Sequence, residues 1–170
     1  MIKAGIIGAT GYAGVELVRL LLCHPKAEVA AVSSVSFEGQ PIADVYPNLN
    51  EITDLVCASA DEVTQKSDVI FAALPHGLSQ DTAAACAAAG KKFIDLGADF
   101  RLDDPDDYAK WYGCEAKYPE LHEQAVYGLC EWFREDIKKT SIVGNPGCYP
   151  TSVALGLAPA LKNGSQPCHL

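Results

Sequence analysis

The sequence lacks several features that mark particular classes of protein. It has no apolar run long enough to span a bilayer, and residues 1–5 enter a strand pattern without the layout of a signal peptide. Basic residues are few: 13 Lys and Arg stand against 22 Asp and Glu, for a net charge of −9. Such a balance argues against nucleic acid or an anionic membrane as a partner. We therefore expect a cytoplasmic protein that uses neither.

Cysteine is not scarce, but the patterns that give it a structural role are absent. The 7 cysteines are odd in number, scattered and never arranged as C-x-x-C, so neither a disulfide framework nor a zinc site is indicated, and we expect no metal. Internal repeats, low-complexity segments and Pro/Ser-rich linkers are absent too. The cysteines are Cys23, Cys57, Cys86, Cys114, Cys130, Cys148 and Cys168.

The composition and the order of the sequence patterns are those of an α/β domain. With 170 residues, of which 49% are hydrophobic and 21% charged, the chain can bury a sizeable core. Strands alternate with helices, which predicts a Rossmann-like, doubly wound parallel sheet. Strands are expected at 2–7, 28–32, 55–58, 68–74, 92–96 and 140–143, and helices at 15–22, 61–66, 79–90, 131–138 and from 152. Residues 37–55 and 103–124 show few regular signals, and 125–132 is expected to be extended.

The first strand leads into a glycine-rich turn and then a helix. This order is the context that a dinucleotide fingerprint requires, because glycines let the backbone approach the pyrophosphate and the helix N-terminus favours its charge. The spacing G-x-x-G-x-x-G departs from the usual G-x-G-x-x-G, and the alternative is a plain strand-to-helix turn. The expected cofactor contacts in the turn are Gly8, Thr10, Gly11, Tyr12, Ala13 and Gly14.

The end of the second strand bears on which dinucleotide is bound. NAD sites usually carry an Asp or Glu there, which holds the ribose hydroxyls and would repel a 2′-phosphate. Glu28 lies at the opposite end of the strand, whereas Ser33, Ser34 and Ser36 supply small hydroxyls at the right end. The pattern favours NADP, with Ser33 and Ser34 as contacts. The alternative is that these serines only terminate the strand.

Two further strand ends carry candidate side chains. The carboxyl ends of parallel strands face the ligand crevice, so the break at Leu74, Pro75 and His76 is expected near the cofactor. His76 is either an acid or base or, as we favour, a loop residue with a backbone or cofactor role. Arg101 follows another strand, and its guanidinium fork suits a phosphate. The alternative for Arg101 is an ion pair with one of its acidic neighbours, which are Asp99, Asp103 and Asp104.

The last strand is followed by a tight turn that carries a cysteine and then by a helix. Unsatisfied N–H groups at a helix N-terminus carry partial positive charge and favour the thiolate, which is the nucleophilic form. Cys148 is therefore the expected nucleophile. Pro150 suits the first helical turn, and Gly147 lets the backbone approach a substrate closely. The alternative is that Cys148 is one more small buried residue.

A nicotinamide site and an activated thiol in one chain point to aldehyde or acyl chemistry. Four blocks of the sequence together resemble N-acetyl-gamma-glutamyl-phosphate reductases and occur in that family's order, at 8–14, 73–77, 95–102 and 144–151. The resemblance implies NADPH-dependent reductive dephosphorylation of a small acyl phosphate, in which Cys148 forms a thioester and N-acetylglutamate 5-semialdehyde is the product. It also implies that Arg101 and Asn145 bind the substrate. The Arg101 block is similar to one in aspartate-semialdehyde dehydrogenases, whose Arg holds phosphate.

The resemblance also sets expectations about the extent of the chain. Members of the family continue into a substrate and oligomerisation domain, which carries an acid/base His that no histidine here matches. We therefore expect residues 1–147 to be the NADP-binding domain and 148–170 to hold the catalytic Cys and the start of a helix into a truncated substrate and dimerisation domain. Such a piece should be almost inactive alone, and the full-length protein should be a homo-oligomer. The histidines are His24, His76, His122 and His169.

Two other functions stay open. A stand-alone NADP-binding module, in which Cys148 is a redox-sensing thiol, fits the same residues. Within the enzyme class, the nearest rival is an enzyme like aspartate-semialdehyde dehydrogenase. It is less favoured because residues 147–150, Gly-Cys-Tyr-Pro, follow the reductase pattern.

Overall fold

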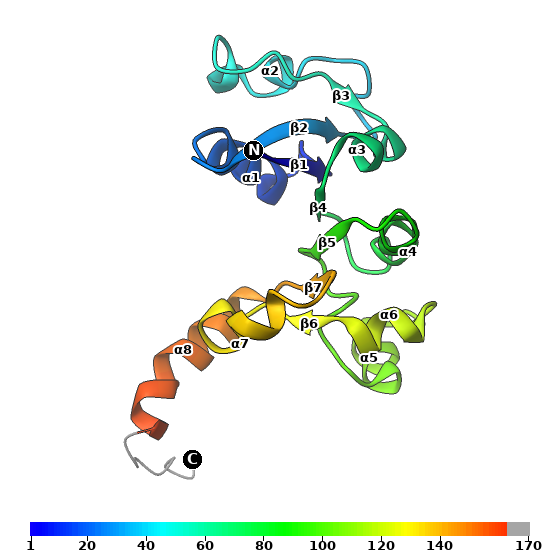
Figure 1. The fold of residues 1–170 in the computed structure, drawn as a ribbon, viewed down its shortest axis with the longest axis vertical. Helices are drawn as coiled ribbons and strands as arrows, with labels where there is room; N and C mark the ends of the chain where they lie inside the picture. Colours follow the sequence, from blue (N-terminus) through cyan, green and yellow to red (C-terminus); the bar gives the residue numbers. More distant parts are fainter. Residues whose placement is uncertain (163–170) are drawn as a thin grey trace.

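One parallel sheet organises the chain (Figure 1). The computed structural model describes residues 1–162, and its seven strands follow the order β3-β2-β1-β4-β5-β7-β6, with every neighbouring pair parallel. The chain adds strands on one side of β1 up to β3 and then on the other side from β4, so the predicted doubly wound α/β fold is confirmed. The strands are β1 (Ile2–Ile7), β2 (Ala27–Ser33), β3 (Cys57–Ala58), β4 (Val69–Ala72), β5 (Lys92–Asp95), β6 (Val126–Tyr127) and β7 (Ile142–Gly144).

Helices pack on both faces of the sheet. Successive side chains of a strand point to opposite faces, so Ile6 and Ile7 of β1 enter different core clusters. The Ile7 cluster includes Val63 of α3 and Ala83 of α4, whereas the Ile6 cluster includes Val18 of α1. The helices are α1 (Tyr12–Leu22), α2 (Ile42–Val45), α3 (Ala60–Lys66), α4 (Gln80–Ala88), α5 (Pro105–Tyr112), α6 (Pro119–Gln124), α7 (Cys130–Ile137), α8 (Cys148–Lys162) and the 3₁₀ helix η1 (Pro47–Leu49).

The stretch 103–124, for which the sequence predicts little regular structure, contains α5 and α6, so that expectation is wrong. Local signals for α5 are present: the Asp104 carboxylate accepts a hydrogen bond from the Asp106 N–H at 2.8 Å, Pro105 opens the helix, and Gly113 ends it in a left-handed conformation. Both helices are shorter than nine residues and bury only one or two side chains each, which leaves a weak periodic pattern.

Two other stretches also differ in detail from the prediction. Residues 37–55 are expected to be an irregular excursion, but they form α2 and η1, which insert Ile42 and Leu49 into the core. Residues 125–132 are expected to be extended, but only β6 is a strand, and α7 begins already at Cys130. In the first stretch, burial against the sheet holds short elements that local periodicity does not report. In the second, the strand has only two residues and pairs with β7, which follows it in the chain.

Helix α8 starts at the sheet and extends away from it (Figure 1). None of its residues is buried, and Val153, Leu157 and Leu161 are each more than half exposed. Cys168, His169 and the rest of 163–170 lie outside the described residues. No helix within residues 1–162 is long and apolar enough to cross a membrane.

Candidate active site

The carboxyl ends of the strands meet along one edge of the sheet. The pairing register aligns the last residues of six strands in the row Ser33, Ile7, Ala72, Asp95, Gly144 and Tyr127. Each group of candidate site residues begins within a few positions of one of these ends. The structure therefore brings the glycine turn, the 74–76 loop, the Arg101 loop and the Cys148 turn to the same edge, as the sequence predicts.

The three glycines of the turn have different roles. Gly8 has φ +80°, and a Cβ there would overlap the Ala73 carbonyl oxygen. At Gly14 a Cβ would overlap the Gly8 oxygen and lie 2.7 Å from Ala9 Cα, so α1 can pack on the turn only through a glycine. A Cβ at Gly11 would meet only the Gly8 oxygen, at 3.5 Å. Gly11 is the N-cap of α1 and leaves that helix start open, as a bound pyrophosphate requires.

The remaining turn residues divide into exposed and anchored positions. Tyr12 is 94% exposed, and Ala13 is exposed beside it at the start of α1. Thr10 is anchored: its Oγ1 lies 2.6 Å from Ser34 Oγ, and its carbonyl accepts a hydrogen bond from the Tyr46 hydroxyl at 2.8 Å. The link to Tyr46, 36 residues away, has no signal in the local sequence.

Ser33 and Ser34 are buried where β2 ends, each only 5% exposed. The Ser33 carbonyl accepts hydrogen bonds from the N–H groups of Gly8 and Ala9, at 3.2 and 2.9 Å. Both serines border a cavity of about 130 Å³ at the sheet edge. The lining of this cavity is Ile7, Gly8, Ser33, Ser34, Val35, Glu38, Ala58, Ser59, Ala60 and Leu74. Gly8, the serines and Leu74, all expected cofactor contacts, therefore line the same cavity.

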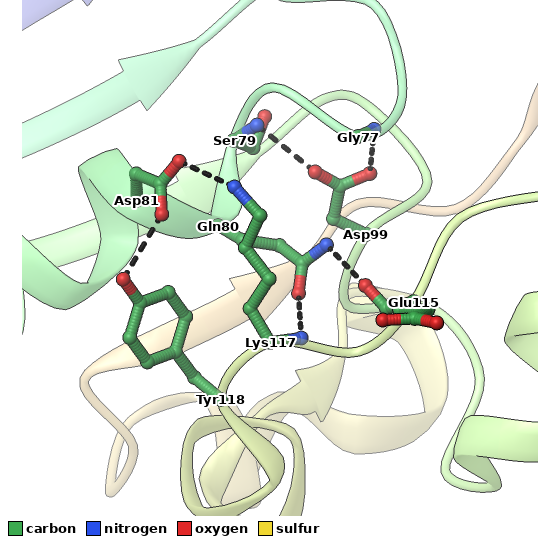
Figure 2. A network of polar contacts seen from close by, with 8 residues as sticks. All are labelled: Gly77, Ser79, Gln80, Asp81, Asp99, Glu115, Lys117 and Tyr118. Atoms are coloured by element: carbon green, nitrogen blue, oxygen red, sulfur yellow. Dashed lines mark hydrogen bonds and ion pairs between the residues drawn. The ribbon is translucent and has the colours of Figure 1, made fainter.

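The loop after β4 is fixed by a carboxylate that the sequence analysis did not assign to the site. Asp99 is fully buried and accepts hydrogen bonds from the N–H groups of Gly77 at 2.6 Å and Ser79 at 2.9 Å, as Figure 2 shows. The Tyr108 hydroxyl of α5 donates to the same carboxylate at 2.9 Å. Burial, and then the hydrogen bond to Asp99, raise the pKa of Tyr108, so this hydroxyl stays a donor. Asp99 thus holds the start of α4 and the preceding loop in place.

Two residues of this loop, Pro75 and His76, are exposed toward solvent. The His76 ring lies 5.7 Å from the Tyr112 ring, centroid to centroid. Within residues 1–162, the His76 side chain makes no hydrogen bond or ion pair, and its role stays a prediction.

A second buried carboxylate, Asp95, holds the loop after β5, and its backbone joins the end of β5 to the turn after β7. It accepts hydrogen bonds from the N–H groups of Gly97 at 2.9 Å and Asp99 at 3.0 Å, and its backbone carbonyl accepts one from the Asn145 N–H at 2.8 Å. Burial raises the pKa of Asp95. The spacing Asp-x-Gly-x-Asp directly after a buried strand is the sequence signal that could have identified both carboxylates.

Arg101 is directed at the cysteine turn. Its Nε donates to the Asn145 carbonyl at 2.7 Å and its Nη2 to the Leu96 carbonyl at 3.0 Å. Among the described residues Arg101 makes no ion pair, so the expected alternative of a pair with an acidic neighbour does not hold. Its Nη1 lies 3.5 Å from the position that a Cβ on Gly147 would occupy. The two carbonyls fix the guanidinium without neutralising it, which leaves donors for an anion.

Cys148 is the first residue of α8 and is exposed. The alternative of a small buried residue is therefore excluded. The first hydrogen bond of the helix runs from the Thr151 N–H to the Gly147 carbonyl at 3.1 Å, and Pro150 lies in the first turn, as the sequence predicts. The Asn145 side chain is half-buried and donates to the Pro146 carbonyl at 3.2 Å. An exposed thiol on the first residue of a helix, in a turn whose Asn145 carbonyl holds Arg101, is a candidate nucleophile toward an anionic substrate.

Comparison with known proteins agrees with this geometry. The family model described as semialdehyde dehydrogenase, NAD binding domain, matches residues 3–140. The chain belongs to this family. In this semialdehyde dehydrogenase domain the match includes the glycine turn and the Arg101 loop and ends before Cys148.

Curated relatives are similar over a longer part of the domain. The chain is 58% identical over 163 residues to N-acetyl-gamma-glutamyl-phosphate reductase of Clostridium beijerinckii, with 96% of this chain and 47% of the relative covered. It is 51% identical over 170 residues to the reductase of the same name from Brachyspira hyodysenteriae, with 96% and 48% covered. The chain thus spans about half the length of the curated relatives it matches.

Solved structures share the fold of this semialdehyde dehydrogenase domain. Aspartate semialdehyde dehydrogenase with NADP from Candida albicans superposes with a TM-score of 0.68 at 18% identity, covering 98% of this chain and 48% of that one. Aspartate semialdehyde dehydrogenase II complexed with ASA from Vibrio cholerae gives 0.67 at 18% identity, covering 95% and 47%.

Proposed function

We propose that this chain is the NADP-binding part, together with the nucleophile, of an N-acetyl-gamma-glutamyl-phosphate reductase. The observation that carries the proposal is the convergence at one sheet edge of an open glycine turn, a fixed arginine and an exposed cysteine at a helix start. Relatives of that name are up to 58% identical over nearly the whole chain, whereas aspartate semialdehyde dehydrogenases share the fold at 18% identity. This difference favours the reductase over the rival enzyme, and the shared name of relatives at this identity favours it over a redox-sensing module.

The cofactor would be held by the residues that the sequence identifies. The open start of α1 would receive the pyrophosphate, and the cavity beside Ser33 and Ser34 would receive the adenosine part. Bound there, NADPH would supply the hydride that reduces the thioester. The proposed contacts are Gly8, Thr10, Gly11, Tyr12, Ala13, Gly14, Ser33, Ser34, Leu74, Pro75 and His76.

The side chains of the cysteine turn would then carry the acyl transfer. The Cys148 thiolate attacks the carbonyl carbon of the acyl phosphate, a C–S bond forms, and the C–O bond to phosphate breaks. Arg101, held by the Asn145 and Leu96 carbonyls, binds the phosphate and stabilises it as it leaves. Asn145, whose backbone joins Arg101 to Asp95, positions the substrate. When the C–S bond of the reduced adduct breaks, the aldehyde leaves and Cys148 is again a thiolate.

The domain boundary belongs to this proposal. Residues 1–147 would form the NADP-binding domain, and 148–170 would begin a substrate and dimerisation region. In support, α8 buries none of its described residues and presents apolar side chains, as an element awaiting a packing partner does. We also propose a cytoplasmic homo-oligomer for the full-length protein.

Alkylation of the 170-residue chain tests the shared site directly. Each cysteine is followed by peptide mass spectrometry at several pH values, with and without NADP. Cys148 should react fastest, and NADP should change its rate while Cys130, which is also exposed, serves as the internal control. If Cys148 reacts like Cys130 and ignores NADP, the cofactor and the thiol do not share a site.

A chimera tests the activity. The chain is joined to the unmatched half of the Clostridium beijerinckii relative, and phosphate-dependent reduction of NADP⁺ by N-acetylglutamate 5-semialdehyde is measured. Cys148→Ser should abolish the activity and Cys130→Ser should leave it. An active Cys148→Ser chimera would overturn the proposed nucleophile.

A further inference from the structure

Glu38 lines the 130 Å³ cavity that is proposed to receive the adenosine part of the dinucleotide. Its carboxylate carries the same sign of charge as the 2′-phosphate of NADP. Directly at the end of β2, where an NAD site usually carries an acid, the chain has only serines. Glu38 comes five positions after Ser33, in the excursion toward β3, and the fold returns it to the same cavity. An acidic residue therefore lines the same cavity as the end of β2, although it comes later in the sequence than in a usual NAD site.

The backbone on both sides of Glu38 is fixed. The Gly39 N–H donates to the Cys57 carbonyl at 2.7 Å, and the Cys57 N–H donates to the Gln40 carbonyl at 2.9 Å, so the segment is joined to β3. On the other side Phe37 packs against the Ile6 core cluster. Glu38 is itself exposed, and these anchors hold its backbone at the cavity that it lines.

The charges around the cavity are unbalanced. Among the residues that line it, all within 1–162, Glu38 is the only charged one, and no Lys, Arg or His is present. An adjoining cavity of about 400 Å³ is also lined by Glu38 and contains Lys66, but Lys66 is paired with Glu62. A phosphate entering here would meet a carboxylate without a free cation to offset it.

The serines offer little compensation. Both side chains are buried, with only 5% of each residue exposed, and the Ser34 hydroxyl is already in hydrogen-bond contact with Thr10. A carboxylate and buried hydroxyls suit a ribose diol, because a carboxylate accepts hydrogen bonds from two hydroxyls and repels a dianion.

We propose that Glu38 is a specificity-determining residue for the 2′ position of the bound dinucleotide, where it weakens the binding of NADPH relative to NADH. This inference rests on the proposed nucleotide site and concerns the selectivity of that site. The chain should therefore bind NADH as well as NADPH. Its preference for NADPH should be smaller than that of the same cavity without the Glu38 carboxylate.

The test is a fluorescence titration of the 170-residue chain with NADPH and with NADH. Glu38→Gln keeps the shape of the side chain and removes its charge. It should tighten NADPH binding by about 3- to 10-fold, the size expected for like charges a few ångströms apart near a surface, and should leave NADH unchanged or weaker. The change should shrink when the salt concentration is raised, because salt screens exposed charges.

Glu28→Gln is the matched control. Glu28 is also exposed on β2 but pairs in register with Lys3, at the other end of the strand from Ser33. Glu28→Gln removes the same charge from the chain but far from the cavity. It should therefore leave the ratio of the NADPH and NADH dissociation constants unchanged. If Glu38→Gln changes that ratio less than twofold, or no more than Glu28→Gln does, the assignment of Glu38 is wrong. Absence of binding of either nucleotide would overturn the nucleotide site itself and the inference with it.

Discussion

Asp99 offers the sharpest test of how the site is held together. Its carboxylate accepts three hydrogen bonds, from the N–H groups of Gly77 and Ser79 and from the Tyr108 hydroxyl, and it is fully buried. Asp99→Asn keeps one oxygen that can accept a hydrogen bond, but the other oxygen becomes an NH₂ group. That NH₂ group faces a donor, so one N–H of Gly77 or Ser79 loses its acceptor. A hydrogen bond to a charged group contributes about 1.5–3 kcal/mol, and a buried donor left without an acceptor costs about 1–3 kcal/mol. We expect Asp99→Asn to lower the free energy of unfolding by about 2–4 kcal/mol.

Urea unfolding followed by circular dichroism measures this change. Asp81→Asn is the control in the same network, because Asp81 pairs with Lys117 and Tyr118 at the surface (Figure 2) and should contribute little. Tyr108→Phe removes one of the three donors and should cost less than Asp99→Asn. If Asp99→Asn unfolds at the same urea concentration as Asp81→Asn, the carboxylate does not hold the loop.

Two further predictions concern pH and the glycine turn. His122 is buried between the rings of Phe100 and Tyr108, and burial lowers its pKa in the folded chain. The unfolded chain therefore binds a proton at His122 more readily, so the free energy of unfolding decreases as pH falls below the unfolded pKa of about 6.5. The urea midpoint should therefore fall less between about pH 7.5 and about pH 5.5 in His122→Phe than in the wild type; equal falls would contradict this. Gly14→Ala places a Cβ 2.7 Å from Ala9 Cα and should destabilise the chain by about 1–3 kcal/mol. Gly11→Ala has no contact closer than 3.5 Å, so it should keep the stability and weaken only nucleotide binding; the reverse result would refute the assignment of the turn.

The framework of the fold could be predicted because its signals are local. The apolar runs of β1, β4 and β7, each followed by glycine or proline, mark parallel strands whose carboxyl ends meet at one edge. This places the glycine turn, the 74–76 loop and the Cys148 turn at that same edge. The open helix start at Gly11 and the exposed cysteine at the start of α8 likewise follow from residue types next to each other in sequence.

What could not be predicted depends on contacts between distant residues. The Gln80 side chain donates to the Glu115 carbonyl at 3.0 Å and accepts from the Lys117 N–H at 2.7 Å, and these bonds seat the segment between α5 and α6 (Figure 2). The partners of Arg101 are backbone carbonyls, which every residue has, so no side-chain pattern identifies them. Glu38 was missed because the loop that returns it to the cavity is fixed by β3, which follows it in the chain.

The position of β7 has a consequence for how the chain is assembled. Among the described strands, β6 lies at the edge of the sheet and has only β7 as a neighbour, although β6 precedes β7 in the chain. During synthesis β6 therefore has no place in the sheet until β7 has emerged and paired with β5. The strand that delivers Cys148 is thus also the one that joins β6 to the rest of the sheet, so a chain in which β7 fails to pair loses both the position of the thiol and the place of β6.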